Sequence, residues 1–84
     1  MGMINVNVSH TSGVDITLHV TSYNGFDEST TSSSHDFSWG YAKKGEYRAV
    51  ASYADGTGYS DSGTTELDSD DDSRTISLTL SNHP

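Results

Sequence analysis

Apolar and polar residues alternate along most of the chain, with the period of two that is typical of half-buried β-strands. Residues 4–8 place Ile4, Val6 and Val8 on one face, and residues 14–21 place four aliphatic side chains on one face. The β-branched side chains in these segments favour a pleated backbone. No segment repeats apolar residues at helical spacing, and strong helix formers are sparse. The pattern therefore predicts an all-β protein.

The most regular stretch, residues 45–67, is predicted to form a hairpin around the tight turn Asp55–Gly56. Its second strand is mostly polar after Tyr59, which predicts an edge strand or a bulge near Gly63. The apolar face of its first strand combines large and small side chains that can interlock, namely Tyr47, Ala49, Ala51 and Tyr53.

Two further strands are predicted from the same alternation. Residues 35–41 place three aromatic side chains, Phe37, Trp39 and Tyr41, on one face. Because Trp39 carries a large apolar surface, we expect it in or near the core. Residues 74–81 place three aliphatic side chains on their inward face and are predicted to form the last strand.

The polar segment 23–35 begins with the turn signal Asn24–Gly25 and is predicted to be a long loop. Residues 26–34 nevertheless leave room for a seventh strand. The chain is thus expected to form one domain over residues 1–84. We predict a small Ig-like or transthyretin-like two-sheet sandwich of six or seven mainly antiparallel strands.

The second half of the chain, residues 44–80, carries a recognisable order of strand motifs. Gly45-Glu46-Tyr47 opens one strand, Gly58-Tyr59 precedes the polar segment 64–67, and an acidic turn leads to a closing strand that ends in Leu80. This order resembles the carboxypeptidase-regulatory-like, or transthyretin-like, group of sandwich domains. The resemblance implies seven strands and an accessory, adhesive or interaction role. The first half of the chain lacks the Gly-x-Val opening typical of the group.

Charge is strongly unbalanced, because twelve acidic residues face four basic ones and the formal net charge is −8. Such a surface repels phosphates and anionic lipids, so we expect no nucleic acid partner and no membrane insertion. The preference for Asp over Glu, the scarcity of Lys and the many Ser and Thr residues resemble haloarchaeal proteins. High salt would screen the self-repulsion of such a surface. The alternative is a functional acidic surface, which binds a cation or mimics nucleic acid as an inhibitor.

Two absences narrow the chemistry and the location. The chain has no cysteine, which excludes disulfides, a thiolate nucleophile and a cysteine zinc site. It also has no apolar run near the ~18 residues of a membrane helix, and no signal peptide is visible. A cytoplasmic location is therefore the default expectation.

Catalysis is not predicted. The serines show no Gly-x-Ser-x-Gly motif or other nucleophile pattern. Strand parity places His10 on the inward face and His19 on the outward face, so these rings should not converge. Most acids are expected in solvated turns, where nothing shifts them toward acid–base chemistry. We therefore expect a non-enzymatic protein.

The sharpest candidate for a metal site is the acidic turn after Leu67, where Asp68, Asp70 and Asp72 alternate. Calcium takes about six to eight oxygen ligands, which such carboxylates can supply. A neighbouring loop could add Asp27 or Glu28. The alternative is a hydrated acidic turn without a ligand. No other cofactor is predicted.

Four aromatic residues at or near predicted loops are candidates for partner binding: Tyr23, Phe26, Tyr41 and Tyr59. Aromatic side chains among Ser, Gly and Asn form adaptable contact surfaces. Alternatively, these residues only close the ends of a small core. The predicted function is an interaction or structural module with a salt-adapted surface and a protein partner, and homo-oligomers through a polar edge strand are possible. The alternatives are a calcium-binding module and an acidic mimic of nucleic acid.

Overall fold

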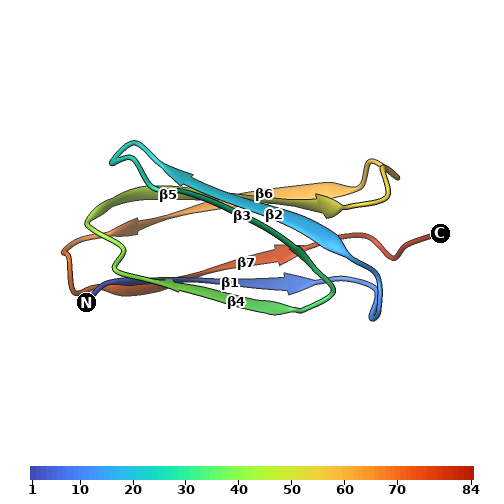
Figure 1. Cartoon of the computed structure of the whole chain (residues 1–84), viewed down its shortest axis with the longest axis horizontal. Coiled ribbons are helices and arrows are strands. Elements are labelled where there is room, and N and C mark those ends of the chain that lie inside the picture. The colour runs from blue at the N-terminus through green and yellow to red at the C-terminus, as the bar shows by residue number, and fades with distance from the viewer.

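The computed structural model describes residues 1–84 as seven β-strands in two stacked sheets (Figure 1). In chain order the strands are β1 Met3–Ser9, β2 Ile16–Ser22, β3 Asp27–Ser32, β4 Asp36–Gly40, β5 Gly45–Tyr53, β6 Ser60–Leu67 and β7 Ser73–Thr79. The predicted all-β, two-sheet sandwich is confirmed. The structure has no helix with the length and apolar character needed to span a membrane.

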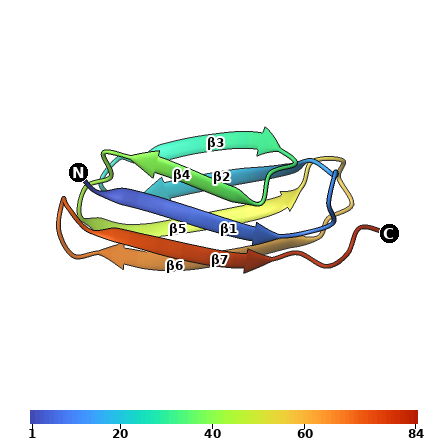
Figure 2. The same ribbon diagram turned by 90° about the horizontal axis from the view of Figure 1, so that it is seen from below.

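The smaller sheet has the strand order β4-β1-β7, and the larger sheet has the order β3-β2-β5-β6 (Figure 2). All strand pairs are antiparallel except β1 with β7, which run parallel. In immunoglobulin constant domains the first strand pairs with the second, in the order ABED. Here β1 and β2 belong to different sheets, so the chain shares the sandwich architecture but not that strand order.

The alternating apolar residues form one core between the sheets, as their pattern predicts. Strand β5, which is central in the larger sheet, buries both of its tyrosines and both of its alanines. Four partly buried side chains pack against the core, namely Val14, Phe26, Phe37 and Trp39. The buried cluster itself consists of Ile4, Val6, Val8, Ile16, Leu18, Val20, Ala42, Tyr47, Ala49, Ala51, Tyr53, Leu67, Ile76, Leu78 and Leu80.

The segment predicted as a long loop contains strand β3, so that prediction is wrong and the seven-strand version of the sandwich is correct. Strand β3 pairs only with β2, from Asp27 opposite Thr21 to Ser32 opposite Ile16. It is an edge strand whose side chains are all polar, and none is fully buried. Because β3 contains no apolar residue, the alternation that predicts the other strands is absent from it.

Strand β6 lies at the other edge of the larger sheet, as predicted, but it has no bulge at Gly63. Its pairing with β5 runs without interruption, and Gly63 lies opposite Ala49. A Cβ atom on Gly63 would come within 3.1 Å of Ile76 Cγ2 and 3.3 Å of Leu78 Cδ2 on strand β7. The glycine thus allows β6 to approach the facing sheet closely.

Candidate functional site

The structure separates the four aromatic residues predicted to bind a partner. The β2–β3 turn with Tyr23 and the β4–β5 turn with Tyr41 lie at one end of the sandwich, whereas the β5–β6 connection with Tyr59 lies at the other (Figure 1). Phe26, Tyr41 and Lys43 line a small hollow of about 170 Å³ between the first two turns. We call the surface formed by Tyr23, Phe26, Tyr41 and Lys43 the tyrosine end.

Side chains at the tyrosine end divide into exposed and supporting residues. Tyr23 is 99 % exposed and Tyr41 is 85 % exposed. Phe26 is partly buried and makes edge-to-face contacts with Tyr47, at 5.2 Å between ring centroids, and with Trp39, at 6.5 Å. Phe26 therefore closes the core, whereas the two tyrosines add little to it and are available for contact with other molecules.

Asn24 joins the two turns of the tyrosine end. Its side-chain nitrogen donates to the backbone carbonyls of Lys43 at 3.3 Å and Lys44 at 3.2 Å. Its side-chain oxygen accepts from the backbone N–H of Phe26 at 2.9 Å. The Tyr47 hydroxyl adds a second tie, because it donates to the Lys43 carbonyl at 2.7 Å. The loops that carry both exposed tyrosines are therefore fixed to each other before any partner arrives.

Tyr41 was predicted to continue the apolar face of its strand, and that prediction is wrong. Strand β4 ends at Gly40, and Tyr41 has a φ of 58°, in the left-handed region. This conformation costs a non-glycine residue about 1–2 kcal/mol. It turns the chain so that Ala42 is buried and its N–H donates to the Gly2 carbonyl at 3.0 Å. A bulky aromatic residue held in this conformation and exposed to solvent suggests a role outside the fold.

Three of the four basic residues, Lys43, Lys44 and Arg48, lie at or beside the tyrosine end. The ion pairs of the protein involve Arg74, the N-terminal amine and two histidines, so these three side chains form none. The tyrosine end therefore carries positive charge that the fold does not use, on a protein with a net charge of −8.

The acidic turn uses its carboxylates within the fold. Asp72 accepts hydrogen bonds from the backbone N–H groups of Asp68 and Ser73, and it pairs with Arg74. These interactions, the bond from Asp68 most of all, lower the pKa of Asp72 from 3.8. Asp68 also pairs with Arg74, at 3.3 Å. Asp70 accepts from the Lys44 N–H at 2.9 Å.

The predicted calcium ligands form no group of three: Asp68 and Asp72 meet only around Arg74. Asp27, one of the two residues that a neighbouring loop could have added, pairs with His19 at 2.6 Å on the larger sheet. In the whole chain no group of three or more His, Cys, Asp or Glu side chains is placed to hold a metal ion. The geometry therefore gives the predicted calcium site at Asp68, Asp70 and Asp72 no support.

The opposite end contains a cluster that the sequence did not predict, formed by His10, His35, Tyr53, Asp55 and His83, which we call the histidine end. The rings of His10 and His35 stack at 4.1 Å between centroids, and His83 contacts Tyr53 edge-on at 5.1 Å. His10 is only 9 % exposed, which agrees with its predicted inward direction. The alternation along a strand predicts whether a side chain points inward or outward. It does not predict that residues from four distant segments come together, because this depends on the tertiary fold.

The histidine rings at the histidine end form hydrogen bonds and an ion pair within the protein. The two ring nitrogens of His10 lie 2.8 Å from the Thr11 carbonyl and 2.9 Å from the Ser34 carbonyl, so neither is available to a metal or substrate. His83 forms a hydrogen-bonded ion pair with Asp55. This hydrogen bond raises the pKa of His83 above 6.5 and lowers the pKa of Asp55 below 3.8.

Comparison with known proteins adds no family to this geometry. No protein-family model matches the chain, and no curated protein matches it.

Proposed function

We propose that this protein is a non-enzymatic interaction module that binds a protein partner through the tyrosine end. One observation carries the proposal: Tyr23 and Tyr41 are almost fully exposed on two turns that Asn24 ties together. Rigid, exposed tyrosines provide contact area at a low cost in conformational entropy. The neighbouring Lys43 and Lys44 add positive charge, which favours a partner with an acidic contact surface.

We also propose that the acidic surface is an adaptation to high salt. Acidic residues occur on strands of both sheets and in turns at both ends, which is a distributed arrangement rather than a phosphate-like stripe. Glu46 lies directly opposite Glu66 on neighbouring strands, and like charges in this position repel. At about 1 M salt the Debye length falls to about 3 Å, which screens this repulsion.

Replacement of one of these glutamates tests the salt proposal. Glu66→Lys turns the repulsion with Glu46 into attraction, so it should raise the melting temperature at low salt and have a smaller effect at about 2 M salt. Thermal melts of both proteins over this salt range measure the difference. A wild-type protein that is equally stable at all salt concentrations would remove the main support for the proposal.

The transthyretin-like grouping is proposed as the structural context of this role. Seven strands in two sheets support it, because the resemblance implies a seven-stranded sandwich. Domains of this kind act mostly as accessory or interaction modules, in keeping with the proposed binding role.

Photo-crosslinking in the source cell tests the proposed partner surface. A photoreactive phenylalanine analogue at position 41 should capture a partner, and the same group at position 59, at the opposite end, should not. Substitution of Tyr23 by Ala should reduce the capture from position 41, because Asn24 fixes the turns of both tyrosines to each other. Equal capture from positions 41 and 59 would contradict the proposal.

A further inference from the structure

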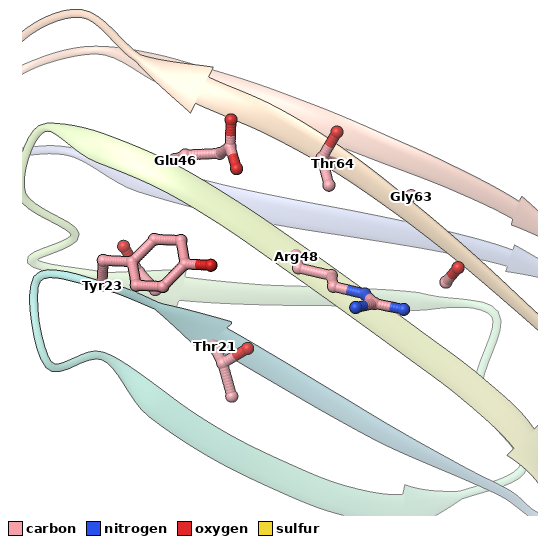
Figure 3. A pocket seen from close by; sticks show the side chains of 8 residues that line it. Thr21, Tyr23, Glu46, Arg48, Gly63 and Thr64 are labelled. Atoms are coloured by element: carbon pink, nitrogen blue, oxygen red, sulfur yellow. The ribbon is translucent and has the colours of Figure 1, made fainter.

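A second hollow lies on the outer face of the larger sheet and is separate from the small hollow beside Tyr41 (Figure 3). Its volume of about 610 Å³ lies within the usual range of about 300–1,000 Å³ for small-molecule sites. Strands β2, β5 and β6 form it, together with the start of the β2–β3 turn. The lining residues are Thr21, Ser22, Tyr23, Glu46, Arg48, Ser62, Gly63 and Thr64.

The strand register places Arg48 at the centre of this hollow. Arg48 lies opposite Thr21 on β2 and opposite Thr64 on β6, so the three side chains form one row across the sheet. Figure 3 shows the guanidinium of Arg48 between these strands, with Tyr23 and Glu46 on the side toward the tyrosine end. Gly63, whose inward side approaches Ile76 and Leu78 of β7, contributes no side chain to the hollow.

Most polar side chains of the hollow have no partners within the protein, whereas the Ser22 hydroxyl accepts from the Asn24 N–H at 3.3 Å. Arg48, Glu46, Thr21 and Thr64 form no side-chain hydrogen bond and no ion pair. Elsewhere on the same face the side chains do pair: Thr17 bonds to Thr31 at 3.3 Å and His19 to Asp27 at 2.6 Å. The side chains in the row through Arg48 therefore carry hydrogen-bonding groups without partners in the protein. The paired strands hold the backbone of this row in a fixed position.

The charges in and around the hollow select among ligand classes. An anion would meet Glu46 and the neighbouring Glu66, whereas a cation would meet Arg48 at the centre. A neutral ligand with many hydroxyls avoids both conflicts, because the guanidinium donates, the carboxylate accepts and the Thr and Ser hydroxyls do both. The ring of Tyr23 at the border offers an apolar surface for the C–H face of a sugar ring.

We propose that this hollow binds a neutral oligosaccharide, with Arg48 and Glu46 bonding to sugar hydroxyls and Tyr23 packing on a sugar ring. Hydrogen bonds and ring contacts of this kind are weakly screened by salt, so the site would also work on a salt-adapted surface. This sugar site is distinct from the proposed protein-binding surface, because Tyr41 does not line the hollow.

Amide NMR titrations test this site with defined probes: neutral hexasaccharides of glucose, mannose, galactose and N-acetylglucosamine, and the acidic hexasaccharide of galacturonic acid. At least one neutral probe, at up to about 10 mM, should shift resonances on β2, β5 and β6 around Arg48, and 2 M salt should change the affinity little. Arg48→Ala should weaken this binding at least about tenfold. Thr31→Ala, a control on the far part of the same face, should leave it unchanged.

Three results would overturn the site: no shift with any neutral probe, shifts centred away from Arg48, or binding of the acidic probe alone. A folded Arg48→Ala protein that binds as tightly as the wild type would also overturn it. The Tyr41→Ala variant separates the two proposals, because it should lose the protein partner and keep the sugar.

Discussion

At the histidine end Tyr53 is 3 % exposed and its hydroxyl joins two other segments, whereas at the tyrosine end Tyr41 is 85 % exposed and its hydroxyl has no partner in the protein. The Tyr53 hydroxyl accepts from the Thr11 N–H at 3.2 Å and donates to the Ser81 carbonyl at 2.6 Å. One end of the sandwich thus uses its aromatic rings to close the core.

The other end closes its core with Phe26 and Tyr47 and carries Tyr23 and Tyr41 in addition. Exposed aromatic residues contribute little to folding, and in the proposed function these two tyrosines contact the partner. We therefore propose that the histidine end stabilises the fold and that the tyrosine end binds a partner. Substitutions at the two ends should separate these properties.

The largest effect is expected for Tyr53→Ala. Truncation of a buried aromatic ring costs about 3–5 kcal/mol, which is a large share of the roughly 4–13 kcal/mol available to a domain of this size. Urea unfolding followed by Trp39 fluorescence measures the loss. Tyr53→Phe, which removes only the hydroxyl, should cost less. A Tyr53→Ala protein as stable as the wild type would mean that the histidine end does not hold the fold together.

Asn24→Ala should affect both stability and binding. It removes the bonds to the carbonyls of Lys43 and Lys44, so we expect a loss of about 1–2 kcal/mol and weaker partner capture. Asn7→Ala is a matched control, because Asn7 also bonds through its side chain, to Asp36 at 2.6 Å, but on the smaller sheet. Equal capture by both variants would show that the tie between the turns does not matter for binding.

Tyr41→Gly should stabilise the protein slightly while it abolishes binding to the partner that crosslinking from position 41 identifies. Glycine relieves the left-handed strain of about 1–2 kcal/mol, and its greater freedom in the unfolded chain offsets about 0.5–1 kcal/mol of this gain. Urea unfolding and a pull-down of the identified partner, measured on the same preparation, test both effects. A destabilised Tyr41→Gly protein would show that the tyrosine supports the fold after all.

The smallest effect is expected from pH at the histidine end. Because the pKa of His83 is raised from 6.5, its contribution is complete below that value and disappears as the pH rises through the folded pKa. Because the pKa of Asp55 is lowered from 3.8, its contribution is present above 3.8 and disappears as the pH falls through the folded pKa.

The ion pair should therefore stabilise the protein most between pH 3.8 and pH 6.5. Melting temperatures of the wild type and Asp55→Asn should differ most in this window and converge at higher pH. A difference that does not change with pH would mean that the charges of this pair are not its source.

Alternation in the sequence was sufficient to predict most of the core, because the inward faces of β1, β2, β5 and β7 are apolar against a more polar outward face, as with Ile4, Val6 and Val8. It failed for β3, where both faces are polar, and for Tyr41, whose direction depends on one left-handed backbone angle. Aromatic content identified candidate contact residues. Their division between two ends depends on strand connections, which a pattern with a period of two does not contain.

The assignment of recognition to the tyrosine end is tested most directly by the double variant Tyr23→Ala/Tyr41→Ala. Its free energy of unfolding and its affinity for the partner identified by crosslinking should be measured together with those of the wild type. We predict a free energy of unfolding within about 0.5 kcal/mol of the wild-type value, because both side chains are exposed, and no binding of the partner. A double variant that binds the partner as tightly as the wild type would contradict the account.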